Sequence, residues 1–326
     1  MGRWSCPLLP GQSHRRVMRA AWHLLRSVGT IVVVVSTVFV LTSLLPGDAA
    51  SVQAGPDEEA AADIRRGLGL ERPLVIRLVL WWGHTLRGDL GQSWLDRADV
   101  ADRLAPRLLT SAAVAAPAWL FAMVGAVVLA LILGGLRGRV VQRIGTGVVA
   151  AIAGVPEAVL VVALVLWLAV SWQMVPAVSL MTPGVPPWEQ PELLVLPTLA
   201  LAIPAMMFAT RVLTGVAEEV WQRRVPTSAL RRGVSPTRVA CVHVLPAMTP
   251  ALAQAAAISA AGILGAGTVA ESLLAYPGIG QLLASSLAAR DLPVVQGVAL
   301  VLATLAVGVF WVADQAAMIA SRRVRR

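Results

Sequence analysis

Six long stretches of this 326-residue chain contain no Asp, Glu, Lys or Arg. A helix needs roughly 20 apolar residues to cross the hydrocarbon core of a bilayer, because it rises about 1.5 Å per residue. Helices and closed barrels both satisfy their backbone hydrogen bonds in lipid, but these stretches lack the alternating pattern of barrel strands. The sequence therefore predicts an all-α membrane protein. The uncharged stretches are residues 27–47, 108–136, 158–188, 193–210, 239–270 and 292–313.

These stretches predict about six transmembrane helices. We expect a disordered basic tail over residues 1–22, a first transmembrane helix within 23–47, an external segment over 48–106 and a core domain over 107–326. Amphipathic patterns around residues 63–66 and 73–86 predict two or three short helices in the external segment. The expected spans are residues 27–46, 108–135, 145–170, 193–216, 247–268 and 293–318.

The charged residues give the predicted topology. Hydrophobic residues make up 57% of the chain and charged residues only 14%, which excludes an ordinary water-facing globule. The net charge is +9, but every basic residue is arginine and the arginines lie between or beside the apolar spans, so we expect no nucleic-acid partner. Arginine-rich segments around residues 3–26, 137–143, 223–238 and 322–326 fall on one side of six spans. The positive-inside rule assigns that side, with both termini, to the cytoplasm of a multi-pass protein in the cell (inner or plasma) membrane.

A cleaved signal peptide is an alternative interpretation of the N-terminus. Basic residues precede an apolar stretch there, and small residues follow at 49–51. The uncharged stretch of residues 27–47 exceeds the roughly 7–15 residues of a typical signal-peptide core, which favours a retained span.

Several kinds of chemistry have no motif in this sequence. A phosphate-binding loop needs a lysine that reaches the β- and γ-phosphates, and the chain contains no lysine. The four histidines and two cysteines show no metal-ligand spacing, so we expect no metal and no cofactor. We therefore expect a protein that is not an enzyme, with any ATP hydrolysis on a separate chain.

The basic loop over residues 217–246 carries a recognisable helix pattern. A short helix is expected from Thr227 to Arg232, with Pro226 in its first turn and Gly233 as its exit at positive φ. Ser235 is a suitable N-cap for a second short helix. From spacing alone, a solvated loop that merely sets topology explains these residues equally well.

The same loop resembles a known signature. Ala229 and Gly233, followed by His243, Leu245 and Pro246, resemble the coupling loop of binding-protein-dependent importer permeases. In that family the short helix docks into a groove on a separate ATPase subunit. The resemblance implies this ATPase-coupling role for Thr227, Ser228, Ala229, Leu230, Arg231, Arg232, Gly233 and Val234.

Four further segments resemble the dipeptide, oligopeptide and nickel branch of these permeases. They are residues 68–74 (LGLERPL), 87–93 (RGDLGQS), 276–280 (YPGIG) and 290–297 (RDLPVVQG), in the family's order. The resemblance implies a type I ABC-importer permease fold and import of di- or oligopeptides, with nickel chelates and glutathione-like solutes still open. It also implies a second homologous permease, two ATP-binding subunits, an external solute-binding protein and a lipid bilayer as partners.

Other candidate site residues lie near or within the spans. Glu157 follows Pro156 inside the third expected span, and Arg211 ends the fourth; both are candidates for a translocation path, in which Glu157 would meet a substrate amine. The structural alternative for Glu157 is a neutral acid, or a pair with an arginine such as Arg211 or one on a partner subunit, and for Arg211 it is a side chain that reaches the cytoplasmic face. Tyr276, Pro277 and Gly278 form an external turn that is either re-entrant or part of the surface for the binding protein.

Two other functions stay open at this stage. A proton-coupled secondary transporter would use acids such as Glu157 and Asp314, but it calls for an internal inverted repeat and the sequence shows none. A polytopic membrane enzyme or scaffold has no recognisable site.

Overall fold

The computed structural model describes residues 11–44, 49–55, 57–136, 138–182 and 184–324. These residues form helices and connecting turns, with an isolated antiparallel bridge between Gln92 and Asp99. The predicted all-α membrane fold is therefore confirmed for the described chain.

Five of the described helices are long and apolar enough to cross a membrane. Each covers all or most of one expected span, so the first, second, fourth, fifth and sixth spans are confirmed as helices, although α1 ends three residues before the expected position 46 and α12 begins two residues after the expected position 247. The five are α1 (Gly11–Ser43), α5 (Val100–Gly135), α8 (Pro191–Trp221), α12 (Thr249–Leu273) and α14 (Leu292–Val324).

The third expected span is bent rather than straight. It consists of α6 (Arg139–Ala153), α7 (Glu157–Leu164) and the π-helical turn η1 (Val165–Ser171), with a 96° bend between the two halves. Pro156 lacks an N–H and disfavours helical backbone at the residue before it, so the helix ends at Gly154. The span count is six only if this bent pair is one span, and the prediction of one continuous helix over residues 145–170 is wrong.

The N-terminal prediction also changes. Helix α1 begins at Gly11, so residues 11–22 are helical and not the disordered tail that the sequence suggested. Residues 1–10 lie outside the described chain.

The external segment contains the predicted short helices. They are α2 (Ala49–Ala54), α3 (Glu58–Gly67) and α4 (Leu74–Thr85). Asp57 caps α3 by accepting hydrogen bonds from the backbone N–H groups of Glu59 and Ala60. Gly69 then leaves α3 at φ +66°, which explains a glycine in the LGL segment.

The centre of the bundle is the contact between α5 and α8. Four alanines at intervals of four residues on α5 are fully buried, and they are Ala118, Ala122, Ala126 and Ala130. Small side chains let two helices approach closely, which replaces the hydrophobic driving force that is missing between helices in lipid. The two helices also approach closely at Gly134, where a Cβ would stand 2.8 Å from the Cβ of Ala217.

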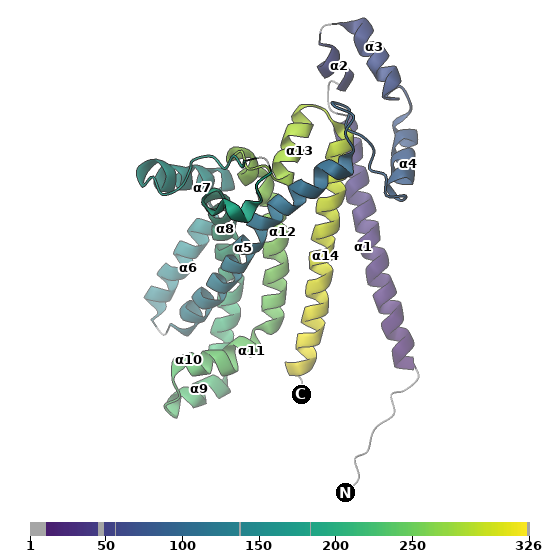
Figure 1. The fold of residues 1–326 in the computed structure, drawn as a ribbon. Coiled ribbons are helices and arrows are strands. Elements are labelled where there is room, and N and C mark those ends of the chain that lie inside the picture. The colour runs from purple at the N-terminus through teal and green to yellow at the C-terminus, as the bar shows by residue number, and fades with distance from the viewer. Residues whose placement is uncertain (1–10, 45–48, 56, 137, 183, 325–326) are drawn as a thin grey trace.

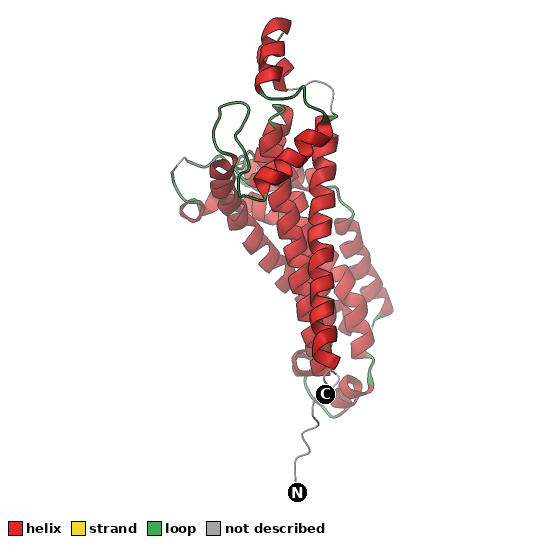
Figure 2. Cartoon of the chain, turned by 90° about the vertical axis from the view of Figure 1, so that its right-hand side faces the viewer, coloured by secondary structure: helices red, strands yellow, loops and turns green. Residues whose placement is uncertain are grey.

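The connecting elements gather at the two ends of this bundle. Figure 1 shows α9 and α10 at the end where α14 finishes and α1 begins, with α2, α3, α4 and α13 (Ile279–Ala288) at the other end. Figure 2, turned by 90° from Figure 1, shows the same long axis, with short helices at both ends of the bundle.

A buried carboxylate joins two of the recognised segments at the end near α13. Asp291 accepts hydrogen bonds from the Ser93 hydroxyl at 2.5 Å and from the Trp94 backbone N–H at 3.0 Å. Asp291 and Ser93 are both fully buried although about 200 positions apart in sequence. This contact fixes the chain that follows α4 against the start of α14.

A second buried carboxylate supports α13. Glu271, near the end of α12, accepts hydrogen bonds from the Gly280 N–H at 2.7 Å and the Gln281 N–H at 3.3 Å. Its other oxygen accepts from the Ser111 hydroxyl on α5 at 2.6 Å. Glu271 therefore caps the first turn of α13, where a negative charge is favoured by the helix dipole. A Cβ on Gly278 would clash with the Glu271 carboxylate, and a Cβ on Gly280 would clash chiefly with the backbone of Thr268, so the two glycines permit this close packing.

Substituting Glu271 tests this cap. We expect Glu271→Ala to destabilise the permease by about 1–3 kcal/mol, because it leaves the buried N–H groups of α13 without an acceptor. Glu271→Gln keeps one acceptor oxygen and is expected to cost less than the alanine variant. Thermal unfolding in detergent measures both. Equal stability of the two variants and the parent protein would contradict the assigned cap.

Candidate functional site

The basic loop forms a compact helical unit at the end of α8. The expected short helix is present as α9 (Arg224–Arg231), which starts three residues earlier than Thr227, and Arg232 is its C-cap. The Thr227 hydroxyl donates to the Arg223 carbonyl at 2.9 Å, which ties the first turn of α9 to its connection with α8.

The predicted glycine exit is confirmed. Gly233 has φ +82°, its N–H donates to the Leu230 carbonyl at 3.0 Å, and the Val234 N–H donates to the Ala229 carbonyl at 3.1 Å. This pair of bonds is the Schellman arrangement that ends helices at a left-handed residue. A residue with a Cβ is strained at this φ, so the position favours glycine.

A second set of helical turns follows. Ser235 occupies the N-cap position of α10 (Pro236–Val239), as expected, but its side chain does not cap a backbone N–H. Instead its oxygen lies 3.4 Å from the Thr237 hydroxyl. The chain continues through the π-helical turn η3 (Ala240–Val244) and α11 (Leu245–Ala247) into α12.

Helix α9 has a buried face and an exposed face. Ala229 is only 2% exposed and Pro226 is also buried, whereas Ser228, Arg231 and Arg232 are exposed. Leu230 and Val234 are partly buried against the same apolar cluster. The buried members of this cluster are Ala126, Ala130, Ala209, Leu213, Ala217, Val220, Ala229, Val239, Val244, Met248 and Ala255.

This cluster connects α9 to three long helices. It contains residues of α5, α8 and α12 together with the buried alanine of α9, so α9 is not a loosely solvated loop. A force on α9 is transmitted into the bundle, because close-packed interiors transmit strain.

The last three residues of the loop signature lie on the return to α12. His243 and Leu245 are half-buried and Pro246 is exposed. Val244, between them, is fully buried in the cluster. They therefore connect the loop to α12 and do not extend the exposed face of α9.

Glu157 and Arg211 do not pair. Glu157 is the first residue of α7, directly after the bend, and its Oε1 is buried without a hydrogen-bond partner in the described chain. Arg211 lies inside α8, ten residues before the end of that helix, and is exposed. The third expected span is therefore not a straight helix at Glu157, because the 96° bend directly precedes this residue.

The external turn is folded inward. Tyr276 is fully buried, and its hydroxyl donates to the Thr110 carbonyl at 2.7 Å. Burial and the neighbouring Glu271 raise the pKa of the Tyr276 phenol above its usual range, so the hydroxyl keeps its proton. Gly278 is also buried, and Pro277 is partly exposed. The structure gives Tyr276 and Gly278 internal packing, so their contact with a binding protein stays a prediction with little exposed surface to support it.

Sequence patterns assign no individual role to the four residues that fix this end of the bundle, which are Ser93, Ser111, Glu271 and Asp291. For two of them the sequence contains a signal of importance, because Ser93 and Asp291 each belong to one of the four segments that resemble the permease family. Sequence spacing does not show that such segments meet.

No metal-binding group is apparent in the described residues. Within them, no three His, Cys, Asp or Glu side chains lie close enough together to hold an ion.

Comparison with known proteins agrees with the geometry. Residues 126–326 match the family model described as binding-protein-dependent transport system inner membrane component. A putative peptide transport system permease of Brucella abortus is 30% identical over 308 residues, covering 92% of this chain and 96% of that protein.

Two other relatives have similar identity. A probable peptide ABC transporter permease of Sinorhizobium fredii is 29% identical, over 92% of this chain and 97% of its own length. The glutathione transport system permease of Salmonella typhimurium is 29% identical, over 84% of this chain and 87% of its own length. Permeases of this kind are multi-pass inner-membrane subunits that work with ATPase and substrate-binding partners and are not enzymes themselves. This chain belongs to the family of binding-protein-dependent transport system inner membrane components.

Proposed function

We propose that this chain is one of two homologous permease subunits that import di- or oligopeptides, driven by two ATP-binding subunits that dock on α9. Relatives named as peptide permeases, each matching over almost the whole chain, support a peptide substrate. One relative is named as a glutathione transport permease, which supports a small peptide-like solute as an alternative substrate.

The observation that carries this proposal is the two-sided construction of α9. Its exposed face offers Val225, Ser228, Arg231 and Arg232 to a partner. Its other face is fixed in the apolar cluster through Ala229. A docking element that drives transport needs both properties, because a movement imposed on the exposed face has to reach the transmembrane helices.

A mechanism follows from this arrangement. ATP binding draws the two ATP-binding subunits together and displaces α9. The shared cluster passes this displacement to α5, α8 and α12, whose relative tilt alternates between inward and outward access. This chain supplies the translocation path and, in α9, the element that transmits movement to it. ATP is hydrolysed on the ATP-binding subunits.

The orientation is also part of the proposal. Helix α9, the end of α14 and the start of α1 lie at one end of the bundle (Figure 1), and α9 carries Arg224 and Arg231 of an arginine-rich segment at this end. The positive-inside rule supports placing this end, and both termini, in the cytoplasm. The external solute-binding protein then delivers substrate to the end that carries α2, α3, α4 and α13.

Glu157 is proposed to line the path and to meet the amino group of a peptide. It stands at a sharp bend, and one of its carboxylate oxygens is buried without a partner. A buried polar atom without a partner costs stability, so its presence at this position supports a functional use.

Charge reversal on the exposed face of α9 tests the docking role. We expect the double variant Arg231→Glu, Arg232→Glu to lose the ATP-binding subunits on co-purification and to lower ATP-driven uptake by about tenfold or more, which corresponds to about 1.4 kcal/mol of docking energy. Both side chains are exposed, so thermal stability is expected to stay unchanged.

Arg143→Glu provides a matched control, because Arg143 is an exposed arginine on α6 near the same end but outside α9. Its uptake is expected to equal that of the parent protein. Full uptake and normal co-purification of the double variant would show that α9 is not the docking element.

Replacement of Glu157 tests the path. We expect Glu157→Ala to lower uptake of a peptide with a free amino terminus more strongly than uptake of the N-acetylated peptide. The unpartnered oxygen is removed, so the stability of this variant is expected to equal or exceed that of the parent protein. Uptake assays in proteoliposomes and thermal unfolding measure the two effects. Unchanged uptake of both peptides would remove Glu157 from the path.

A further inference from the structure

Helix α4 is apolar on both of its faces although it is external to the five long helices. Its sequence is LVIRLVLWWGHT, and its twelve residues span about 18 Å, which is too short to cross a bilayer. Apolar residues occupy two opposite faces of α4, with Arg77 and His84 on the side between them, and an exposed apolar face belongs either against a protein or in contact with lipid. The packing of each face decides between these two environments.

One face of α4 packs against α1. The Trp82 indole N–H donates to the Ser36 hydroxyl at 3.0 Å, and the Trp81 ring lies 6.1 Å from the Phe39 ring. Leu78 on the same side is half-buried. Figure 1 shows α4 beside the outer part of α1, at the edge of the bundle.

The opposite face of α4 is exposed and has no polar residue. Val75 is 68% exposed and Val79 is 65% exposed, and Ile76 and Leu80 beside them are also exposed. These four positions follow the i, i+4 spacing that places them on one side of a helix. No residue of α4 is fully buried.

The contacts with α1 set the level of α4 in the membrane. Ser36 and Phe39 lie seven and four residues before the end of α1, which is about 10 Å and 6 Å along the helix axis. Both belong to the stretch of α1 that forms its membrane span. The half of α4 that carries the two tryptophans therefore lies level with the outer end of a transmembrane helix.

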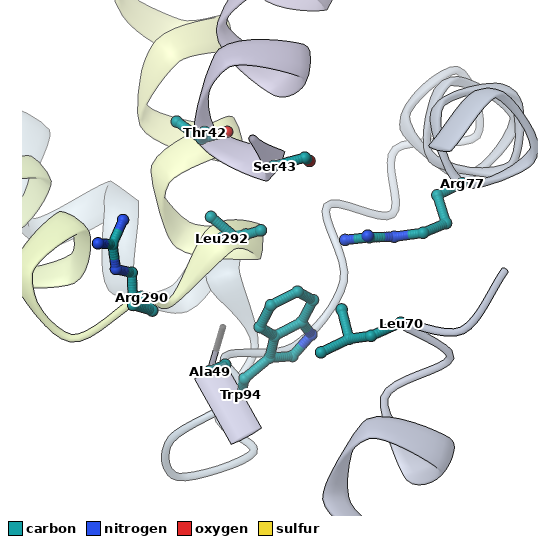
Figure 3. A pocket seen from close by; sticks show the side chains of 8 residues that line it. All are labelled: Thr42, Ser43, Ala49, Leu70, Arg77, Trp94, Arg290 and Leu292. Atoms are coloured by element: carbon teal, nitrogen blue, oxygen red, sulfur yellow. The ribbon is translucent and has the colours of Figure 1, made fainter. Parts of the chain in front are cut away.

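Arg77 marks the boundary between lipid and water. It extends from α4 toward a cavity of about 200 Å³ near the end of α1 (Figure 3). Thr42 and Ser43, the last residues of α1, line the same cavity together with Trp94. A long cationic side chain that turns toward the end of the adjacent span, with tryptophans on the same helix, is typical of the membrane interface.

We infer that α4 is an interfacial helix whose face formed by Val75, Ile76, Val79 and Leu80 is embedded in the outer leaflet of the lipid bilayer. Helix α1, which α4 contacts, also has exposed apolar side chains along its span, and Val33 among them is 64% exposed. Charged residues lie at both ends, with Glu71 and Arg72 before α4 and Arg87 and Asp89 after it. Apolar area between polar ends lets a short helix contact the outer leaflet without spanning the membrane, and α4 does so in the upright direction that it has beside α1 in Figure 1.

Nitroxide accessibility at Val79 tests this inference. The protein would carry Cys6→Ser and Cys241→Ser, with a single cysteine at Val79→Cys, Val33→Cys or Glu59→Cys, in nanodiscs of phosphatidylethanolamine and phosphatidylglycerol. Val33→Cys reports lipid on α1, and Glu59→Cys reports water on α3, where Glu59 is exposed. Collisions with oxygen and with a water-soluble nickel chelate are measured at each label.

We expect the label at Val79 to collide readily with oxygen and rarely with the nickel chelate, with a ratio close to that at Val33 and several-fold above that at Glu59. The ratio should be the same in the isolated permease and in the complex with its ATP-binding subunits and binding protein. Free access of the nickel chelate at Val79 would place the face in water and overturn the inference. Low access of both reagents in the complex, relieved in the isolated permease, would assign the face to a protein partner and also overturn it.

Discussion

The close packing of α5 against α8 is the contact on which the rest of this structure depends. Two helices in lipid gain little from hiding apolar surface from each other, so they associate where small side chains permit close contact. The four buried alanines of α5 and the near contact at Gly134 provide this. The N-terminal half of α5 holds Ser111, which donates a hydrogen bond to Glu271, and its C-terminal half belongs to the cluster that anchors α9. One helix pair thus connects the end of the bundle that carries α13 to α9, the proposed docking element.

Two acidic residues show how the same chemistry serves different purposes. Glu271 is buried, and both of its oxygens accept hydrogen bonds from Ser111, Gly280 and Gln281. Glu157 is half-buried, and one of its oxygens has no partner in the described chain. A satisfied carboxylate rigidifies its surroundings, whereas an unsatisfied one is available to a ligand. This contrast is the reason that Glu271 is interpreted as structural and Glu157 as functional.

Much of the fold could be predicted from the sequence because lipid imposes simple rules. The charge-free stretches predicted five of the long helices, and Gly233 predicted that α9 ends at a residue with positive φ. The bend at Gly154–Pro156 was missed because hydropathy does not record helix direction, although Pro156 offered a local signal. The contacts of Glu271 and Asp291 could not be predicted, since each joins segments far apart in the chain and spacing carries no information on which segments meet. The proposed role of Glu157 depends on this bend, because Glu157 is the first residue of α7 after it.

The central claim is that ATP hydrolysed on another chain drives this permease through α9. The most direct measurement is photo-crosslinking from a benzoylphenylalanine placed at Ser228, on the exposed face of α9, in membranes that contain the complete transporter. The account predicts a crosslink to an ATP-binding subunit that changes in yield when ATP binds, and no such crosslink from the same probe at Val33 on the lipid-facing side of α1. Absence of a crosslink from Ser228 in an assembled, transport-competent complex would contradict it.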